Sequence, residues 1–166
     1  MFDSARSAVL TSLPDAPLTN FTCSPDPDNP GWLRWRLADE TRYNEAVLGR
    51  QLVRAEGTDT CRLRMFPQHH HTNSAGNVHG AISLGLIDVS MFAALYVLRG
   101  VDAGRSVTVD VSTQFIGAGD PSRPLDAVVE VLRETRRLAF LRGLIMQDDG
   151  IVAAFSGTAR KPSERK

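Results

Sequence analysis

The sequence predicts an α+β domain in which an antiparallel sheet curls around one long buried helix. Residues 78–99 are apolar on nearly every side of a helix, which indicates a helix buried on most of its surface. After residue 105 the pattern switches to alternating apolar and polar residues in four short segments, which is typical of antiparallel strands. The outer strand edges of such a sheet need covering, and we expect dimerisation through those edges to cover them.

Prolines are concentrated at the N-terminus, where the run SPDPDNPG excludes a helix or a central strand. We therefore expect a partly ordered N-terminal arm over residues 1–36, one folded domain over 37–162 and a C-terminal tail over 163–166. Within the domain the pattern predicts a short helix over 38–50 and two strands over 51–66, which precede the long helix. Four strands joined in sequence order as a meander are expected after it.

Composition and charge set expectations about partners and location. The chain of 166 residues carries 19 basic and 19 acidic side chains, so bulk charge indicates neither a nucleic-acid nor a membrane partner. The N-terminus has no long apolar core after a basic start, and only two cysteines occur, so we expect a cytoplasmic protein. The long helix matches a bilayer in length, but Asp88 in its middle favours burial in a protein core.

The junction between a polar loop and the long helix has the chemistry of an anion site. Asn77 is a natural N-cap, which would place Val78, His79 and Gly80 in the first helical turn. The backbone N–H groups of a first turn have no carbonyl partner within the helix, and they point out of its positive end. Gly80 has no side chain that would keep a ligand away, so its N–H is a candidate donor to a developing oxyanion.

Asp88 lies about two turns into the apolar helix. Because burial of an unpaired carboxylate is costly, Asp88 is either a base or nucleophile that faces a cavity, or a structural acid paired with an arginine. His79 and Asp88 are nine residues apart, which at about 100° per residue places them on opposite faces of the helix. A site that uses both residues would therefore be assembled between two subunits.

The junction has a characteristic spacing of polar residues and glycines, with Asp88 eight positions after Gly80. The other residues of this pattern are His71, Asn73, Gly76 and His79. This pattern resembles the PaaI-like branch of the hotdog thioesterases, and the resemblance extends from about residue 43 to residue 161. That family usually has a second glycine where this chain has Ala81, whose methyl group would narrow the mouth of a pocket. The resemblance implies a hotdog fold, hydrolysis of an acyl-CoA thioester and self-association as a homodimer, with a dimer of dimers (a homotetramer) left open.

The resemblance also implies a role for each site residue. Asp88 would act as general base on water or attack the thioester carbonyl directly, while the Gly80 N–H would hold the carbonyl oxygen. Asn73 would orient the water or the carbonyl, and His79 would line the pocket. Thr108 would place the water near Asp88. Residues in contact with the substrate would include Gly76, Ala81 and Phe115. No metal and no organic cofactor is implied.

Other interpretations of the same residues stay open. Asn73 alone is typical of a turn, and Thr108 is typical of a strand. The successive histidines 69–71 suggest a metal site, but their side chains would alternate in an extended chain, and no cysteine or carboxylate lies at ligand spacing. Competing functions are a non-catalytic acyl-CoA-binding module and an acyl hydratase or dehydratase. An intact Asp88 favours a hydrolase over a binding module, because a binding module needs no base.

Overall fold

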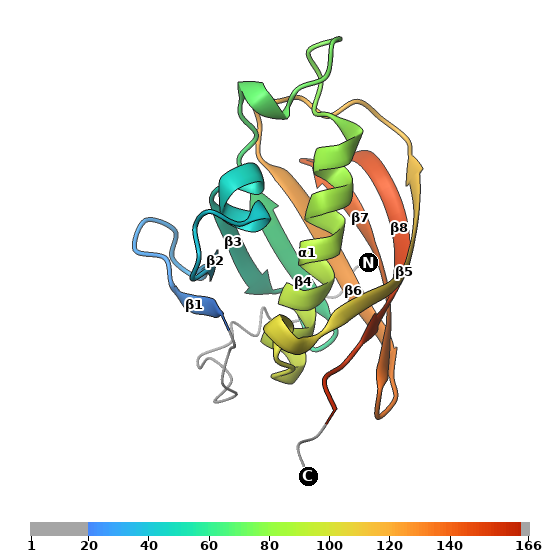
Figure 1. Ribbon diagram of the computed structural model, residues 1–166. Coiled ribbons are helices and arrows are strands. Elements are labelled where there is room, and N and C mark those ends of the chain that lie inside the picture. The colour runs from blue at the N-terminus through green and yellow to red at the C-terminus, as the bar shows by residue number, and fades with distance from the viewer. Residues whose placement is uncertain (1–19, 164–166) are drawn as a thin grey trace, which may run out of the picture.

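An eight-stranded antiparallel sheet curls around one long helix in residues 20–163, the part of the chain that the computed structural model describes (Figure 1). Helix α1 (Gly80–Arg99) lies across the concave side of the sheet, so the predicted α+β architecture is confirmed. The strands are β1 (Phe21–Pro25), β2 (Leu33–Leu37), β3 (Gln51–Ala55), β4 (Thr60–Met65), β5 (Val107–Phe115), β6 (Leu125–Glu134), β7 (Leu138–Gln147) and β8 (Gly150–Arg160). The short helical turns are η1 (Asn44–Leu48), η2 (His69–His71) and η3 (Ala103–Arg105).

The four strands after α1 do not form the predicted meander. The sheet order is β1-β2-β3-β4-β6-β7-β8-β5, so β5 pairs with β8 and β6 pairs with β4. The link between β5 and β6 contains Gly117, Pro121 and Pro124, and it is too long and irregular for a tight hairpin. The turn between β7 and β8 is as predicted, because Asp148 adopts a left-handed conformation with φ 49°. Strand β5 is consequently an edge strand, at the opposite end of the sheet from β1.

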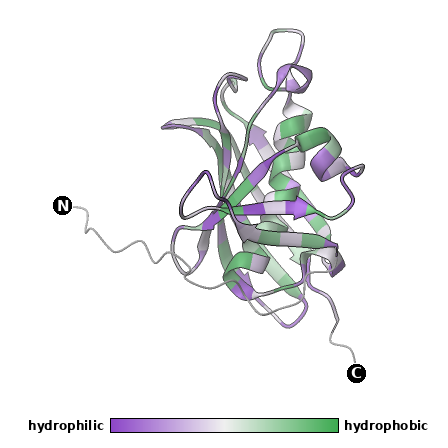
Figure 2. Cartoon of the chain, turned by 90° about the vertical axis from the view of Figure 1, so that its left-hand side faces the viewer, coloured by the Kyte–Doolittle hydropathy of each residue, from purple (hydrophilic) through white to green (hydrophobic). Residues whose placement is uncertain are grey.

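Helix α1 supplies much of the core. Its side chains Leu86, Met91 and Leu95 are fully buried between the helix and the sheet. The helix is long and apolar enough to cross a membrane, but 67% of its most apolar window is buried inside the protein, as expected of a core helix. Figure 2 shows hydrophobic stretches along α1 and alternating bands on the strands. One stripe of α1 stays accessible, since Leu84 is 44% exposed and Asp88 is half-buried.

The helix predicted over residues 38–50 is reduced to η1, a single π-helical turn. Asp39 forms a tight turn instead, because its carboxylate accepts hydrogen bonds from both the backbone N–H and the hydroxyl of Thr41. Gly49 ends the segment with φ 70°, in agreement with the predicted glycine stop. The two strands predicted over 51–66 are confirmed as β3 and β4.

Residues 21–37 form a β-hairpin that is continuous with the sheet. Strands β1 and β2 pair with each other and β2 pairs with β3, so the predicted boundary after residue 36 falls within β2. Trp35 is only 1% exposed, and its ring stacks on that of Phe21 with the centroids 5.0 Å apart. The part of the predicted arm over residues 1–19, like residues 164–166 of the predicted tail, lies outside the described residues.

Asp26 ties the turn of this hairpin to the sheet. Its buried carboxylate accepts hydrogen bonds from Arg34 at 2.6 Å, from Arg50 at 3.0 Å and from the side-chain amide of Asn29 at 2.8 Å. These hydrogen bonds, first of all the one from Arg34, hold the pKa of Asp26 well below its usual range. The carboxylate is therefore the form of Asp26 that the folded hairpin stabilises.

We expect Asp26→Asn to lower the free energy of unfolding at neutral pH and to flatten its dependence on acid. A carboxyl group whose pKa is depressed in the folded state stabilises the fold above its unfolded pKa, which is about 4. That contribution is lost as the pH falls below about 4 toward the folded pKa. Urea unfolding of wild type and variant between neutral pH and about pH 3 measures the difference, with Asp28→Asn, whose side chain is exposed, as the control. Equal stability of wild type and Asp26→Asn at neutral pH would contradict the anchoring role.

Candidate active site

Asn73 shapes the loop that precedes α1. Its backbone N–H donates to the carbonyl of Asn77 at 2.8 Å, and its side-chain Oδ1 accepts from the N–H groups of Ala75 and Asn77 at 2.9 and 3.1 Å. Gly76 in the same turn has φ 77°, a conformation that favours glycine. The oxygen of Asn73 is thus occupied by the turn, while no described residue accepts from its side-chain NH₂ group. The orientation of that NH₂ group is consequently fixed.

His71 fastens this loop to η1. Its Nδ1 accepts from the N–H of Gln68 at 2.8 Å, and its Nε2 donates to the carbonyl of Val47 at 2.5 Å. Burial lowers the pKa of His71, which agrees with a neutral ring whose two nitrogens are both engaged. Within residues 20–163, no three or more histidine, cysteine, aspartate and glutamate side chains are grouped to hold a metal ion. His71 therefore has a structural role.

Helix α1 begins two residues later than predicted, with His79 rather than Asn77 as its N-cap. His79 is extended, with φ −67° and ψ 138°, and its Nδ1 accepts from the N–H of Ala81 at 3.0 Å. This hydrogen bond fixes the imidazole ring at the N-terminus of the helix. In a neutral ring it leaves the proton on Nε2. His79 and Ala81 are both exposed at this end of the helix.

Gly80 is the first helical residue and carries the free N–H of the first turn. The two N–H groups before it are engaged, because Val78 donates to Gly119 and His79 donates to His71, both at 2.8 Å. No acceptor for the Gly80 N–H is found among the described residues. The N–H lies at the positive end of a 20-residue helix, so it is suited to donate to a negatively charged oxygen.

Asp88 lies two turns further along α1 and contacts β5. The hydroxyl of Thr108 donates to Asp88 Oδ1 at 2.5 Å, so these two predicted site residues are in direct contact within one subunit. Asp88 forms no ion pair with any described residue. Arg42 lines the same cavity but pairs with Asp39 at 3.0 Å, so a structural pair between Asp88 and an arginine is not observed. The second carboxylate oxygen, Oδ2, is left for water or substrate.

Strand β5 spans the two halves of the predicted site. At its start Thr108 contacts Asp88, and at its end the ring of Phe115 covers Gly80, where an added Cβ would lie 3.3 Å from the ring. Asp88 is eight positions after Gly80 in the helix, which corresponds to about 12 Å along the axis. One subunit therefore brings Asp88 to Thr108, and Gly80 to Phe115, but it does not bring the two pairs together.

A cavity of about 250 Å³ lies beside Asp88. Helix α1, η3, the segment before η1 and the β1–β2 hairpin all contribute to its walls, with apolar side chains that include Phe21, Trp35, Leu37, Val89 and Phe92. The contribution of the hairpin was not predicted from the sequence, because Phe21 and Trp35 flank a proline-rich run without periodic pattern. The spacing of Trp35 from Leu37 on one strand face was the available signal.

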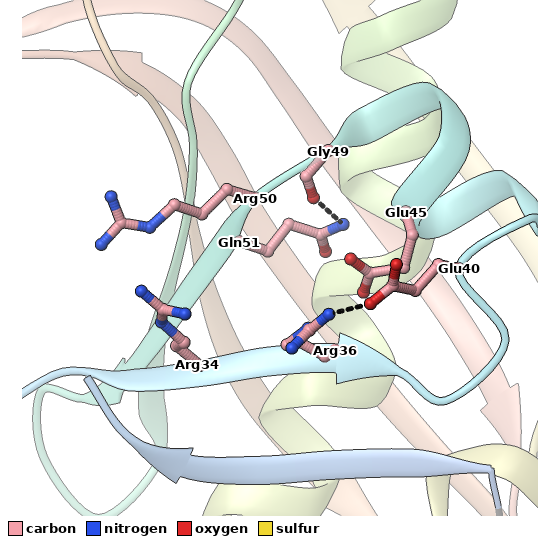
Figure 3. Close-up of a pocket in the computed structure, with 7 residues that line it drawn as sticks. All are labelled: Arg34, Arg36, Glu40, Glu45, Gly49, Arg50 and Gln51. Carbon is pink, nitrogen blue, oxygen red and sulfur yellow. Dashed lines mark hydrogen bonds and ion pairs between the residues drawn. The ribbon is translucent and has the colours of Figure 1, made fainter. Parts of the chain in front are cut away.

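A second cavity, of about 390 Å³, is polar and contains none of the predicted site residues (Figure 3). Most of its charged side chains are neutralised within the protein, since Arg36 pairs with Glu40 while Arg34 and Arg50 pair with Asp26. The cavity is lined by Arg34, Arg36, Glu40, Glu45, Gly49, Arg50 and Gln51. The site chemistry thus belongs to the smaller cavity beside Asp88.

A protein-family model described as the acyl-CoA thioesterase N-terminal domain matches residues 68–160. The match covers more than half of the chain and runs from the loop before α1 to the end of β8. The chain belongs to the acyl-CoA thioesterase family. The protein, hereafter the thioesterase, is therefore a hydrolase of thioesters, as predicted. The family match favours this function over the alternatives of a binding module and a dehydratase.

Individual relatives agree with the predicted resemblance. Acyl-coenzyme A thioesterase 13 of Homo sapiens is 28% identical over 104 residues, which span 61% of the thioesterase and 71% of the human protein. The PaaI protein of the E. coli phenylacetic acid degradation operon has a TM-score of 0.62 at 17% identity, covering 75% of the thioesterase and 87% of PaaI. A hypothetical thioesterase protein of Streptococcus pneumoniae, solved with coenzyme A, has a TM-score of 0.57 at 21% identity, covering 66% and 83%. The predicted hotdog fold is confirmed by these neighbours.

Proposed function

We propose that the thioesterase hydrolyses acyl-CoA to a free acid and CoA in a site shared by two subunits. Asp88 and Thr108 of one subunit face the loop and helix terminus of the other, which supply Asn73, His79 and Gly80. The family match supports a thioester substrate, and the structural neighbour solved with coenzyme A supports a CoA ester. Gly76 and Ala81, next to these groups in the chain, would line the entrance for the substrate.

The position of the two half-sites at opposite ends of β5 carries this proposal. Strand β5 pairs with β8 on one side only, so its other edge is free among the described residues. If a second β5 pairs antiparallel about the middle of the strand, near Val111 and Ser112, the start of one strand lies opposite the end of the other. Asp88, beside the start, then faces Gly80, beside the end of the strand in the second subunit.

The surface around β5 supports a homodimer. Val109 and Phe115 on this strand are 57% and 56% exposed, and the exposed Leu84 lies on the accessible stripe of α1. An edge strand with exposed apolar side chains and unpaired backbone groups favours pairing with another chain. A second subunit would cover both features at once. Light scattering on the purified protein measures the assembly directly, and a monomer with full activity would contradict a shared site.

The chemistry follows from these positions. The Gly80 N–H donates to the thioester carbonyl oxygen, on which negative charge develops. Asp88 of the second subunit removes a proton from water, and the oxygen adds to the carbonyl carbon. The tetrahedral intermediate then expels the CoA thiolate as the C–S bond breaks, and the proton passes from Asp88 to the thiolate. Thr108 holds Oδ1 of Asp88, so that Oδ2 meets the water. The fixed NH₂ group of Asn73 orients the water or the carbonyl.

Direct attack by Asp88 on the carbonyl carbon fits the same geometry. An acyl-enzyme anhydride forms as the C–S bond breaks and the CoA thiolate leaves, and water then hydrolyses the anhydride and supplies the proton to the thiolate. In a single turnover in water labelled with ¹⁸O, label found in Asp88 identifies this second route. With Asp88 as base, the label appears in the free acid at once. With Asp88 as nucleophile, water that attacks the Asp88 carbonyl carbon leaves the label in the enzyme.

We expect Gly80→Pro to lower kcat by about 10²–10³-fold, the usual effect of losing one oxyanion donor, and Gly80→Ala to retain most of the activity. Proline removes the N–H but is well tolerated at the first position of a helix. Both substitutions add a carbon next to the Phe115 ring, so the difference between them isolates the N–H group. Thiol release from a panel of acyl-CoA esters measures kcat. Equal losses in the two variants would contradict the oxyanion role.

A further inference from the structure

The cavity beside Asp88 is walled by a segment that the family match does not include. Its volume is about 250 Å³, and Asp88 and Phe92 of α1 lie in one wall. The opposing apolar side chains include Phe21, Trp35 and Leu37 of the β1–β2 hairpin. The family model begins only at residue 68, more than 30 residues after the hairpin ends. The hairpin thus adds a wall from outside the matched region, next to the carboxylate on which the proposed reaction depends.

The added wall is held in place from several sides. The ring of Trp35 stacks on Phe21 at 5.0 Å and packs against Tyr96 of α1 at 5.7 Å between centroids. Strand β2 is hydrogen-bonded to β3, and Asp26 fastens the hairpin turn through Arg34 and Arg50. A wall that is packed, paired and anchored in this way limits the room in the cavity and does not yield easily to a longer ligand.

The size and lining of the cavity define the acyl group that it accepts. Drug-sized ligands occupy pockets of about 300–1,000 Å³, which are larger than this cavity. The rings of Phe21, Trp35 and Phe92 make much of the lining apolar. The cavity is therefore suited to a compact apolar group.

We propose that the β1–β2 hairpin forms one wall of the acyl pocket and makes the thioesterase favour compact apolar acyl groups, such as octanoyl, over long ones, such as palmitoyl. Phe21 of the hairpin and Phe92 of α1 set this preference, because both side chains line the cavity, one from each element. The inference rests on the proposed function, since the acyl group lies beside Asp88 only if Asp88 acts on the thioester.

The test compares kcat/KM for acyl-CoA esters from acetyl to palmitoyl in wild type and in Phe21→Ala and Phe92→Ala. We expect wild type to hydrolyse palmitoyl-CoA at least about tenfold less efficiently than octanoyl-CoA, and each variant to raise the palmitoyl-to-octanoyl ratio about tenfold. Thr22→Ala is the matched control, because Thr22 is exposed and its side chain points to the opposite face of β1 from Phe21. The ratio does not depend on the folded fraction, and Phe21→Leu and Phe92→Leu repeat the test with smaller losses of packing.

Each outcome bears on a different claim. A raised ratio in the Phe21 and Phe92 variants but not in Thr22→Ala supports the hairpin as the limit on acyl length. An unchanged ratio in these variants, or a wild type that prefers palmitoyl-CoA, overturns this inference and leaves the proposed reaction intact. A wild type that hydrolyses none of the esters overturns the proposed function, and the inference about acyl length is then withdrawn with it.

Discussion

Replacing Asp88 with asparagine is expected to lower kcat for acyl-CoA hydrolysis by about 10²–10⁴-fold, the usual contribution of a general base. The amide keeps the size of the side chain and still accepts the hydrogen bond from Thr108, but it cannot take a proton from water or form an anhydride. The expected loss is therefore the same in direction for both proposed routes. Thiol release at saturating substrate gives kcat for wild type and variant.

Asp149→Asn is the control for this variant. Asp149 is exposed in the turn between β7 and β8, outside β5, and the substitution removes the same charge without touching the cavity. Its activity should stay near that of wild type. Circular dichroism and the thermal midpoint verify that Asp88→Asn is folded. Full turnover by a folded Asp88→Asn protein would remove Asp88 from the mechanism.

Mixing two inactive variants is expected to restore activity if the site is shared. In a dimer of one Asp88→Asn subunit and one Gly80→Pro subunit, one site combines an intact Gly80 with an intact Asp88, and the other site lacks both. Random mixing makes half of the dimers mixed, each with one intact site of two, so about a quarter of wild-type activity should return. Co-expression of the two variants with different affinity tags, followed by purification on both tags, isolates the mixed dimer, which should have about half of wild-type activity.

The same experiment can also contradict the shared site. If Gly80 and Asp88 acted within one subunit, each subunit of the mixed dimer would lack one of them, and the mixture would stay as inactive as its parts. Each variant assayed alone at the same total concentration sets that baseline. A mixed dimer whose activity stays at that baseline would contradict the shared site, even if Asp88→Asn alone has the expected effect.

The helix and the strands were predictable because their signals are local. The all-round apolar composition of residues 78–99 requires burial, and alternation after residue 105 requires strands with one covered face. The pairing of β5 with β8 was not predictable, since it depends on contacts between residues that are 38 to 53 positions apart. The meander was predicted from the turn between β7 and β8, which proved correct, and from the link before β6, which is not a turn.

The start of α1 also depends on a contact between residues distant in the chain, which the sequence pattern does not reveal. Asn77 has a good capping side chain, but its neighbour Val78 donates to Gly119, far along the chain, and this contact holds residue 78 outside the helix. His79 takes the cap instead, so Gly80, not Val78, opens the helix and keeps a free N–H. The prediction of a donor at Gly80 therefore agrees with the geometry, although the cap that places it there was wrong.

The hairpin and β5 lie at opposite edges of one sheet. In the proposed dimer, a side chain near the middle of β5 meets its own copy across the twofold axis, so any substitution there is made twice within a single contact. The observed contacts of Phe21, by contrast, are with Trp35 and the walls of the cavity in the same chain. In that dimer the β5 edge is constrained by symmetry, while the hairpin lies at the other end of the sheet. Substrate range can diverge at the hairpin while subunit association stays as it is.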